Sequence, residues 1–95
     1  MRLNFKAKEI QELKVPHLVI LLELINKPFE LMSSISEAYN ITTYTISKAC
    51  MRLGNGGYGN RTKGLGYIES AVQGRTRRLR LTEKGKDVVS KIFIN

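Results

Sequence analysis

Apolar residues in the first 26 positions recur at helical spacing. Leu3, Ile10 and Leu13 stand among charged side chains, which predicts a short amphipathic helix within residues 1–15 that ends before Pro16. Residues 17–26 are apolar on almost every side, a pattern typical of a helix that is buried on more than one face. In so small a chain we expect the core on one side of this helix and a second subunit on the other.

The next stretch predicts two helices joined by a short turn. The buried face of the first helix is expected to hold Leu31, Ile35, Ala38 and Tyr39. Ser34 and Glu37 have the spacing of a capping box, and Asn40 is suited to a left-handed end of the helix. Thr42 is a good N-cap for a second helix over residues 43–53. Two helices this close have the outline of a helix-turn-helix.

The remainder of the chain predicts a loop, a hairpin and a last helix. Six of the eight glycines fall in residues 54–66. Two strands, Tyr67–Val72 and Arg77–Thr82, are expected around a turn at Gln73–Thr76. Leu79 and Leu81 alternate with Arg78 and Arg80, giving the second strand one buried and one basic face.

The pattern as a whole predicts an α+β fold, a winged helix-turn-helix. We expect about four to five helices and a two- or three-stranded antiparallel wing in a single domain over residues 1–95. Its parts would be an N-terminal helix in 1–15 with a possible dimer contact, a helix-turn-helix plus wing in 16–82, and a C-terminal helix in 83–95.

Charge separates the two halves of the chain. The chain has sixteen Lys and Arg residues and eight Asp and Glu residues, which gives a net charge of +8. The first 47 residues carry no net charge. All of the excess therefore lies in residues 48–95. A basic surface confined to one part of a small protein favours a polyanionic partner, most commonly nucleic acid.

The helix over 43–53 would carry polar and basic groups outward. Ile46, Ala49, Cys50 and Leu53 share the core-facing side at a spacing of i, i+3, i+4 and i+7. No carboxylate stands anywhere in this helix, whereas a plain solvent-facing helix usually mixes both signs of charge. Its candidate groups for the major groove are Thr43, Tyr44, Thr45, Ser47, Lys48 and Arg52.

The predicted wing, residues 72–80, supplies a second basic cluster. Arg75, Arg77, Arg78 and Arg80 have no carboxylate among them, and the acidic residue nearest to the cluster along the chain is Glu83. A polyanion would relieve the repulsion between these arginines. Protection of an edge strand is the alternative role for such arginines.

In the glycine-rich loop, Arg61 and Lys63 could order over phosphates, or the segment could be a linker with incidental charges. The spacing of Gly54, Gly56 and Gly59 matches the Gly-x-Gly-x-x-Gly pattern of dinucleotide-binding sites. A helix is expected before them and a strand after them, the reverse of what pyrophosphate binding needs, so we expect no nucleotide cofactor.

Three segments together resemble the winged helix-turn-helix of the MarR-like transcriptional regulators. They are Thr42-Thr43-Tyr44-Thr45-Ile46-Ser47-Lys48, Gly66-Tyr67-Ile68-Glu69 and Arg77-Arg78-Leu79-Arg80-Leu81-Thr82-Glu83-Lys84-Gly85. The resemblance covers about residues 16–90, with a longer segment at 54–66 than that family usually has. It implies a dimeric DNA-binding regulator, with Thr43, Tyr44, Thr45, Ser47 and Lys48 in the groove and Arg77 at the wing.

We therefore expect a sequence-specific regulator of double-stranded DNA, acting as a homodimeric repressor in the cytoplasm. The alternatives are a winged-helix protein-interaction module and an architectural nucleic-acid-binding protein. An enzyme, a metal site and any cofactor are not expected, because the chain has one Cys and one His. Cys50 is expected to be a small buried side chain, and His17 a packed or interface residue. No apolar run approaches the ~20 residues of a membrane span.

Overall fold

Helix α1 (Val15–Asn26) is the centre of the fold. It contacts α2 (Met32–Tyr39), α3 (Thr43–Leu53), α4 (Glu83–Ile92) and strand β3 (Thr76–Leu81). The computed structural model describes residues 2–54, 64–73 and 76–94. The side chains of α1 enter a core whose fully buried members are Ile20, Leu21, Leu24, Ile35, Ile46, Leu53, Ile68 and Ile92.

The surroundings of α1 explain its apolar composition. Elements of the same chain pack against it on several sides, and among its large apolar side chains only Val15 is strongly exposed. A second subunit is therefore not needed to cover this helix. The homodimer stays a prediction, but it no longer draws support from residues 17–26.

The helix-turn-helix is formed by α2 and α3, and local capping fixes its turn. Asn40 ends α2 in the left-handed region at φ 53°, where Asn is tolerated better than most residues. The backbone N–H of Thr45 donates to Thr42 Oγ1 at 3.2 Å, so Thr42 is the N-cap of α3. Both of these predicted caps are confirmed.

The capping-box spacing of Ser34 and Glu37 falls inside α2 and does not cap its N-terminus. The helix begins at Met32 and its N-cap, Leu31, makes no side-chain cap hydrogen bond, so Ser34 and Glu37 lie inside the helix. Ile35 is buried as expected, whereas Ala38 is exposed. Ile35 is therefore the buried apolar side chain of this short helix, with Leu31 and Tyr39 half-buried.

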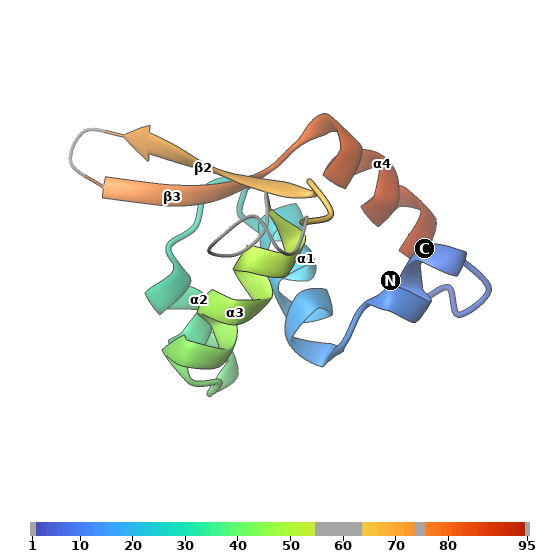
Figure 1. Cartoon of the computed structure of the whole chain (residues 1–95), viewed down its shortest axis with the longest axis horizontal. Coiled ribbons are helices and arrows are strands. Elements are labelled where there is room, and N and C mark those ends of the chain that lie inside the picture. The colour runs from blue at the N-terminus through green and yellow to red at the C-terminus, as the bar shows by residue number, and fades with distance from the viewer. Residues whose placement is uncertain (1, 55–63, 74–75, 95) are drawn as a thin grey trace.

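Strands β2 (Ile68–Gln73) and β3 form an antiparallel hairpin that corresponds to the predicted wing. Ile68 pairs with Leu81 at the base and Gln73 with Thr76 at the far end. Glu30, between α1 and α2, forms an isolated bridge with Leu79, with backbone hydrogen bonds of 3.1 and 2.8 Å. Figure 1 shows the hairpin extending past α2 and α3, on the side away from both termini. The α+β, winged-helix-like fold class is thus confirmed, with four α-helices among the described residues.

The hairpin starts where α3 ends. The N–H groups of Gly66 and Tyr67 donate to the carbonyls of Gly54 and Leu53 at 2.9 and 2.7 Å, and Leu65 donates to Arg52. These bonds satisfy carbonyls that a helix end otherwise leaves without partners. The end of α3 and residues 65–67 therefore lie side by side.

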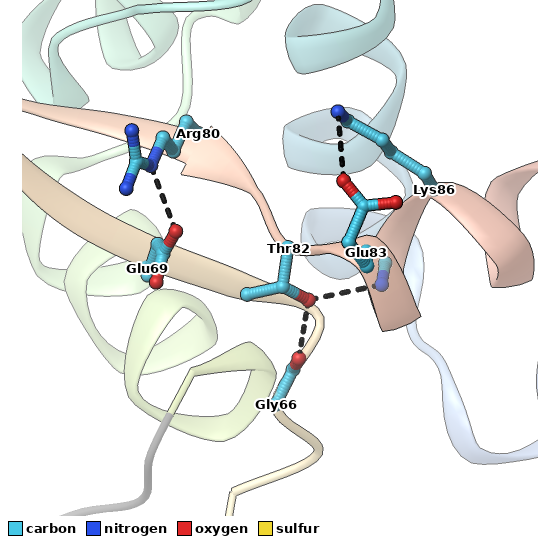
Figure 2. Close-up of polar contacts among 7 residues, drawn as sticks. Gly66, Glu69, Arg80, Thr82, Glu83 and Lys86 are labelled. Carbon is cyan, nitrogen blue, oxygen red and sulfur yellow. Dashed lines mark hydrogen bonds and ion pairs between the residues drawn. The ribbon is translucent and has the colours of Figure 1, made fainter.

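Helix α4 is joined to the start of the hairpin by Thr82. Its hydroxyl donates to the Gly66 carbonyl at 2.6 Å and accepts from the Gly85 N–H at 3.0 Å, as Figure 2 shows. A Cβ at Gly85 would lie 1.9 Å from the Tyr67 carbonyl oxygen. The Thr-x-x-Gly spacing at 82–85 is therefore a packing requirement as well as a helix cap.

The two termini differ from the prediction. Residues 1–15 contain a short strand β1 (Arg2–Leu3) and a 3-10 helix η1 (Lys8–Glu12) rather than one amphipathic helix. Helix α4 ends at Ile92, and β4 (Phe93–Ile94) pairs antiparallel with β1, so a helix through 83–95 is also wrong. Strands β1 and β4, which lie together in Figure 1, pair through their backbones where the prediction had placed helix. The spacing of apolar residues along the sequence does not indicate such pairing between distant segments. No helix in the described part of the chain is long and apolar enough to span a membrane.

Candidate nucleic-acid interface

The outward face of α3 carries the polar groups that the sequence predicts there. Tyr44 is 68% exposed and Thr43 and Lys48 are exposed, while Ile46, Ala49 and Leu53 are buried. Thr45, Ser47 and Arg52 are half-buried on the flanks of the helix. One side of α3 therefore presents hydroxyls and cations to solvent, and the opposite, apolar side packs on the core.

Tyr44 and Lys48 form one unit on this face. The Lys48 Nζ lies 5.0 Å from the centroid of the Tyr44 ring, a cation–π distance between residues one helical turn apart. A hydrogen bond with Tyr44 raises the pKa of Lys48, which is an ammonium at neutral pH in any case. The pair thus presents a fixed cation beside an aromatic ring and hydroxyl.

A groove of about 430 Å³ runs between α3 and the segment that leads into α1. We call it the α1–α3 groove; its lining residues are Glu12, Lys14, Pro16, His17, Tyr44, Thr45, Lys48, Ala49 and Arg52. Lys14 and His17 were not predicted as site residues. They are some 30 positions from α3 in the sequence, and no local pattern indicates that contact.

His17 has a defined role at the start of α1. The backbone N–H of Lys14 donates to His17 Nδ1 at 2.9 Å. Burial, followed by the charges of Arg52 and Lys14, lowers the pKa of His17 below its usual value. The ring is therefore neutral at pH 7, with its own proton on Nε2.

The wing arginines are not equivalent. Arg80 Nε lies 2.7 Å from Glu69 Oε1 across the hairpin, which Figure 2 shows, so the prediction that no carboxylate is nearer than Glu83 is wrong in space. Arg78 is half-buried and stands opposite Ala71. Arg77 is described by its backbone only, paired with Val72, and Arg75, Arg61 and Lys63 lie outside the described residues.

The thiol of Cys50 lies in surroundings that keep it unreactive. Burial raises the pKa of the Cys50 thiol to about 12, in keeping with its expected place on the inner side of α3. Among residues 2–54, 64–73 and 76–94, no three His, Cys, Asp or Glu side chains gather where they could hold a metal ion.

No protein-family model matches this chain, and the searches of curated proteins and of solved structures found no match either. Its function is therefore argued from the geometry of its own residues.

Proposed function

We propose that the protein binds double-stranded DNA with α3 in the major groove and the hairpin β2–β3 on the flanking backbone or in the minor groove. The observation that carries this proposal is the outward face of α3. It joins the Tyr44–Lys48 pair to exposed or half-buried hydroxyls and Arg52, in a helix without a carboxylate.

This face matches what a major groove offers. Base edges there present acceptors and donors within reach of Lys, Arg, Ser and Thr side chains, and the flanking phosphates attract cations. An α-helix fits the groove by width. A carboxylate at any of these positions would repel the phosphates, and α3 has none.

The regulatory part of the proposal comes from the sequence resemblance to the MarR-like regulators, which implies a dimeric DNA-binding regulator. A protein that occupies a promoter excludes other proteins from it, so we propose a repressor that acts in the cytoplasm as a homodimer. A symmetric dimer would bind a pseudo-palindrome with half-sites about one helical turn apart. Sedimentation velocity on the free protein and on its complex with DNA distinguishes one copy from two.

Selection from a random duplex pool at two salt concentrations tests the proposal most directly. A specific regulator enriches one sequence, with two inverted halves if it is a dimer, and the enrichment survives the higher salt. Binding that is lost with salt and enriches nothing indicates an architectural protein. A pool that is never retained contradicts DNA binding.

A protein-interaction module is the second candidate, and a different surface favours it. A groove of about 820 Å³ lies between the end of α1, the hairpin and α4. Apolar side chains line much of it, including Leu24, Leu81 and Val89, and Phe29 at its edge is 41% exposed. Charges of both signs, from Glu69, Arg80, Glu83 and Lys86, surround them. Such a mixed rim suits a protein partner better than a polyanion.

A further inference from the structure

We propose that the α1–α3 groove is a binding site for one backbone phosphate of duplex DNA, so that Lys14, from outside the helix-turn-helix and the wing, takes part in the interface. This inference rests on the proposed function and extends it to a residue from the half of the chain that has no net charge.

Charge is the first support. Among the residues that the structure describes, the lining of the groove includes three cations, Lys14, Lys48 and Arg52, and one carboxylate, Glu12. Lys14 and Lys48 are exposed and come from opposite walls. A phosphate between the two walls would offset the repulsion between these cations.

Hydrogen-bond donors are the second support. Thr45 Oγ1 accepts from the Thr42 hydroxyl at 2.9 Å, so its own proton is left to point elsewhere. His17 accepts the Lys14 N–H through Nδ1, so its neutral ring offers Nε2–H as a donor. Both residues line the groove, and phosphate oxygens accept from hydroxyl and imidazole groups.

The position of the groove favours a phosphate over a base. Tyr44 and Lys48 lie where the outward side of α3 meets the groove, and the groove continues along the flank of the helix toward the start of α1. A helix in the major groove has a phosphate backbone on each side, and contacts to it fix register and orientation. The hairpin would contact one backbone and the α1–α3 groove the other.

His17 provides a direct readout because it is the only histidine of the chain. The titratable and charged groups that line the groove together with His17 are Glu12 before α1, Lys14 at the N-cap, and Tyr44, Lys48 and Arg52 on α3. In the free protein burial, Arg52 and Lys14 lower its pKa. A phosphate in the groove adds a negative charge that favours the imidazolium, so the pKa of His17 is expected to rise on binding.

The experiment combines an NMR titration of the His17 ring with salt-dependent duplex binding by the full chain. The ring is titrated in the free protein, with a short duplex, and with inorganic phosphate at matched ionic strength. Duplex affinity is measured against salt for wild type, Lys14→Gln and Lys86→Gln. Lys86, an exposed residue of α4 paired with Glu83, loses the same charge outside the groove and serves as the control.

We expect the duplex, but not inorganic phosphate, to raise the pKa of His17. We also expect Lys14→Gln to lower the salt slope by about 0.9, the value of one phosphate contact, with Lys86→Gln changing it less. If the duplex binds but leaves the pKa of His17 unchanged, and Lys14→Gln and Lys86→Gln have equal salt slopes, this inference is overturned while the proposed function stands. A response to inorganic phosphate without duplex binding makes the groove a free-anion site and overturns it too. No duplex binding and no phosphate response contradict the proposed function itself.

Discussion

Glu69 and Arg80 face each other across the β2–β3 hairpin, with Glu69 Oε1 2.7 Å from Arg80 Nε. Both side chains are about half exposed, so the pair contributes only about 0.2–1 kcal/mol to stability. Its larger consequence is electrostatic. The carboxylate neutralises one of the basic groups proposed to meet DNA.

Replacement of Glu69 by Gln is therefore expected to strengthen duplex binding. The change frees the Arg80 guanidinium and removes a negative charge from the hairpin, so the salt slope of binding should steepen by about 0.9 if Arg80 then contacts a phosphate. Fluorescence anisotropy with a labelled duplex over a range of salt concentrations measures both quantities.

Glu83→Gln is the matched control for Glu69→Gln. It removes the same charge from an exposed carboxylate at the start of α4, where Glu83 pairs with Lys86. Equal gains in duplex affinity by the two variants would show that the effect comes from net charge alone and that Arg80 does not contact DNA.

Tyr44 and Lys48 are expected to act as a coupled pair in sequence recognition. Tyr44→Ala and Lys48→Ala should each weaken binding to the selected site by about 1–3 kcal/mol while non-specific binding changes less. Because Lys48 Nζ lies 5.0 Å from the Tyr44 ring centroid, the double variant should lose less than the sum of the two, by about 0.5–1 kcal/mol.

Ser33→Ala, an exposed change on α2, is the control for this cycle. Strict additivity of Tyr44 and Lys48 would show that their contact does not survive on DNA. Unchanged binding in both single variants would remove the outward face of α3 from the site.

Interactions between near neighbours in the sequence were the predictable part of this fold. The Thr42 and Thr82 caps and the left-handed Asn40 depend on hydrogen bonds within a few residues, so residue type alone indicates them. The alternation around Leu79 likewise predicts which face of β3 is buried.

Contacts between distant segments could not be read in this way. Lys14 comes near α3 only because α1, which begins at the next residue, packs against α3. Glu69 meets Arg80 through the register of the hairpin; the predicted strands imply this pairing when they are aligned antiparallel, whereas distance along the chain points to Glu83. The apolar sides of α1 indicate burial but not whether the same chain or a partner provides it, and here the same chain does so.

Gly85→Ala is expected to destabilise the protein although Ala is the better helix former. Propensity alone would favour Ala by about 1 kcal/mol. The new Cβ, however, would lie 1.9 Å from the Tyr67 carbonyl oxygen, and backbone rather than a flexible side chain would have to move. We expect a net loss of about 1–3 kcal/mol in the free energy of unfolding, measured with urea.

Ser90→Ala in the same helix gives the propensity effect without the contact, because Ser90 is exposed. It should be neutral or slightly stabilising. A gain in stability from Gly85→Ala would show that α4 and the start of β2 do not approach as closely as described.

Cys50 is expected to resist alkylation in the folded protein. With a pKa of about 12, its thiolate fraction at pH 8 is lower by about a thousandfold than that of an exposed thiol with a pKa near 8.5. The rate of reaction with iodoacetamide, followed by mass spectrometry, should be far lower in native buffer than in urea. Equal rates would instead place Cys50 among accessible, redox-sensing thiols.

Acidification is expected to destabilise the fold through His17. Its pKa in the folded protein is below the ordinary value of 6.5, so near and below that value the unfolded chain binds more protons than the folded one. The free energy of unfolding therefore falls as the pH falls through 6.5 toward the folded pKa. Protonation would also place a proton on Nδ1, where the Lys14 N–H now donates.

Urea unfolding of wild type and His17→Gln between about pH 5 and 8 isolates this effect, since the carboxylates contribute to both proteins alike. The stability of wild type relative to the variant should be constant at the upper end of the range and decline below pH 6.5, and a difference that stays level throughout would contradict a buried, neutral His17.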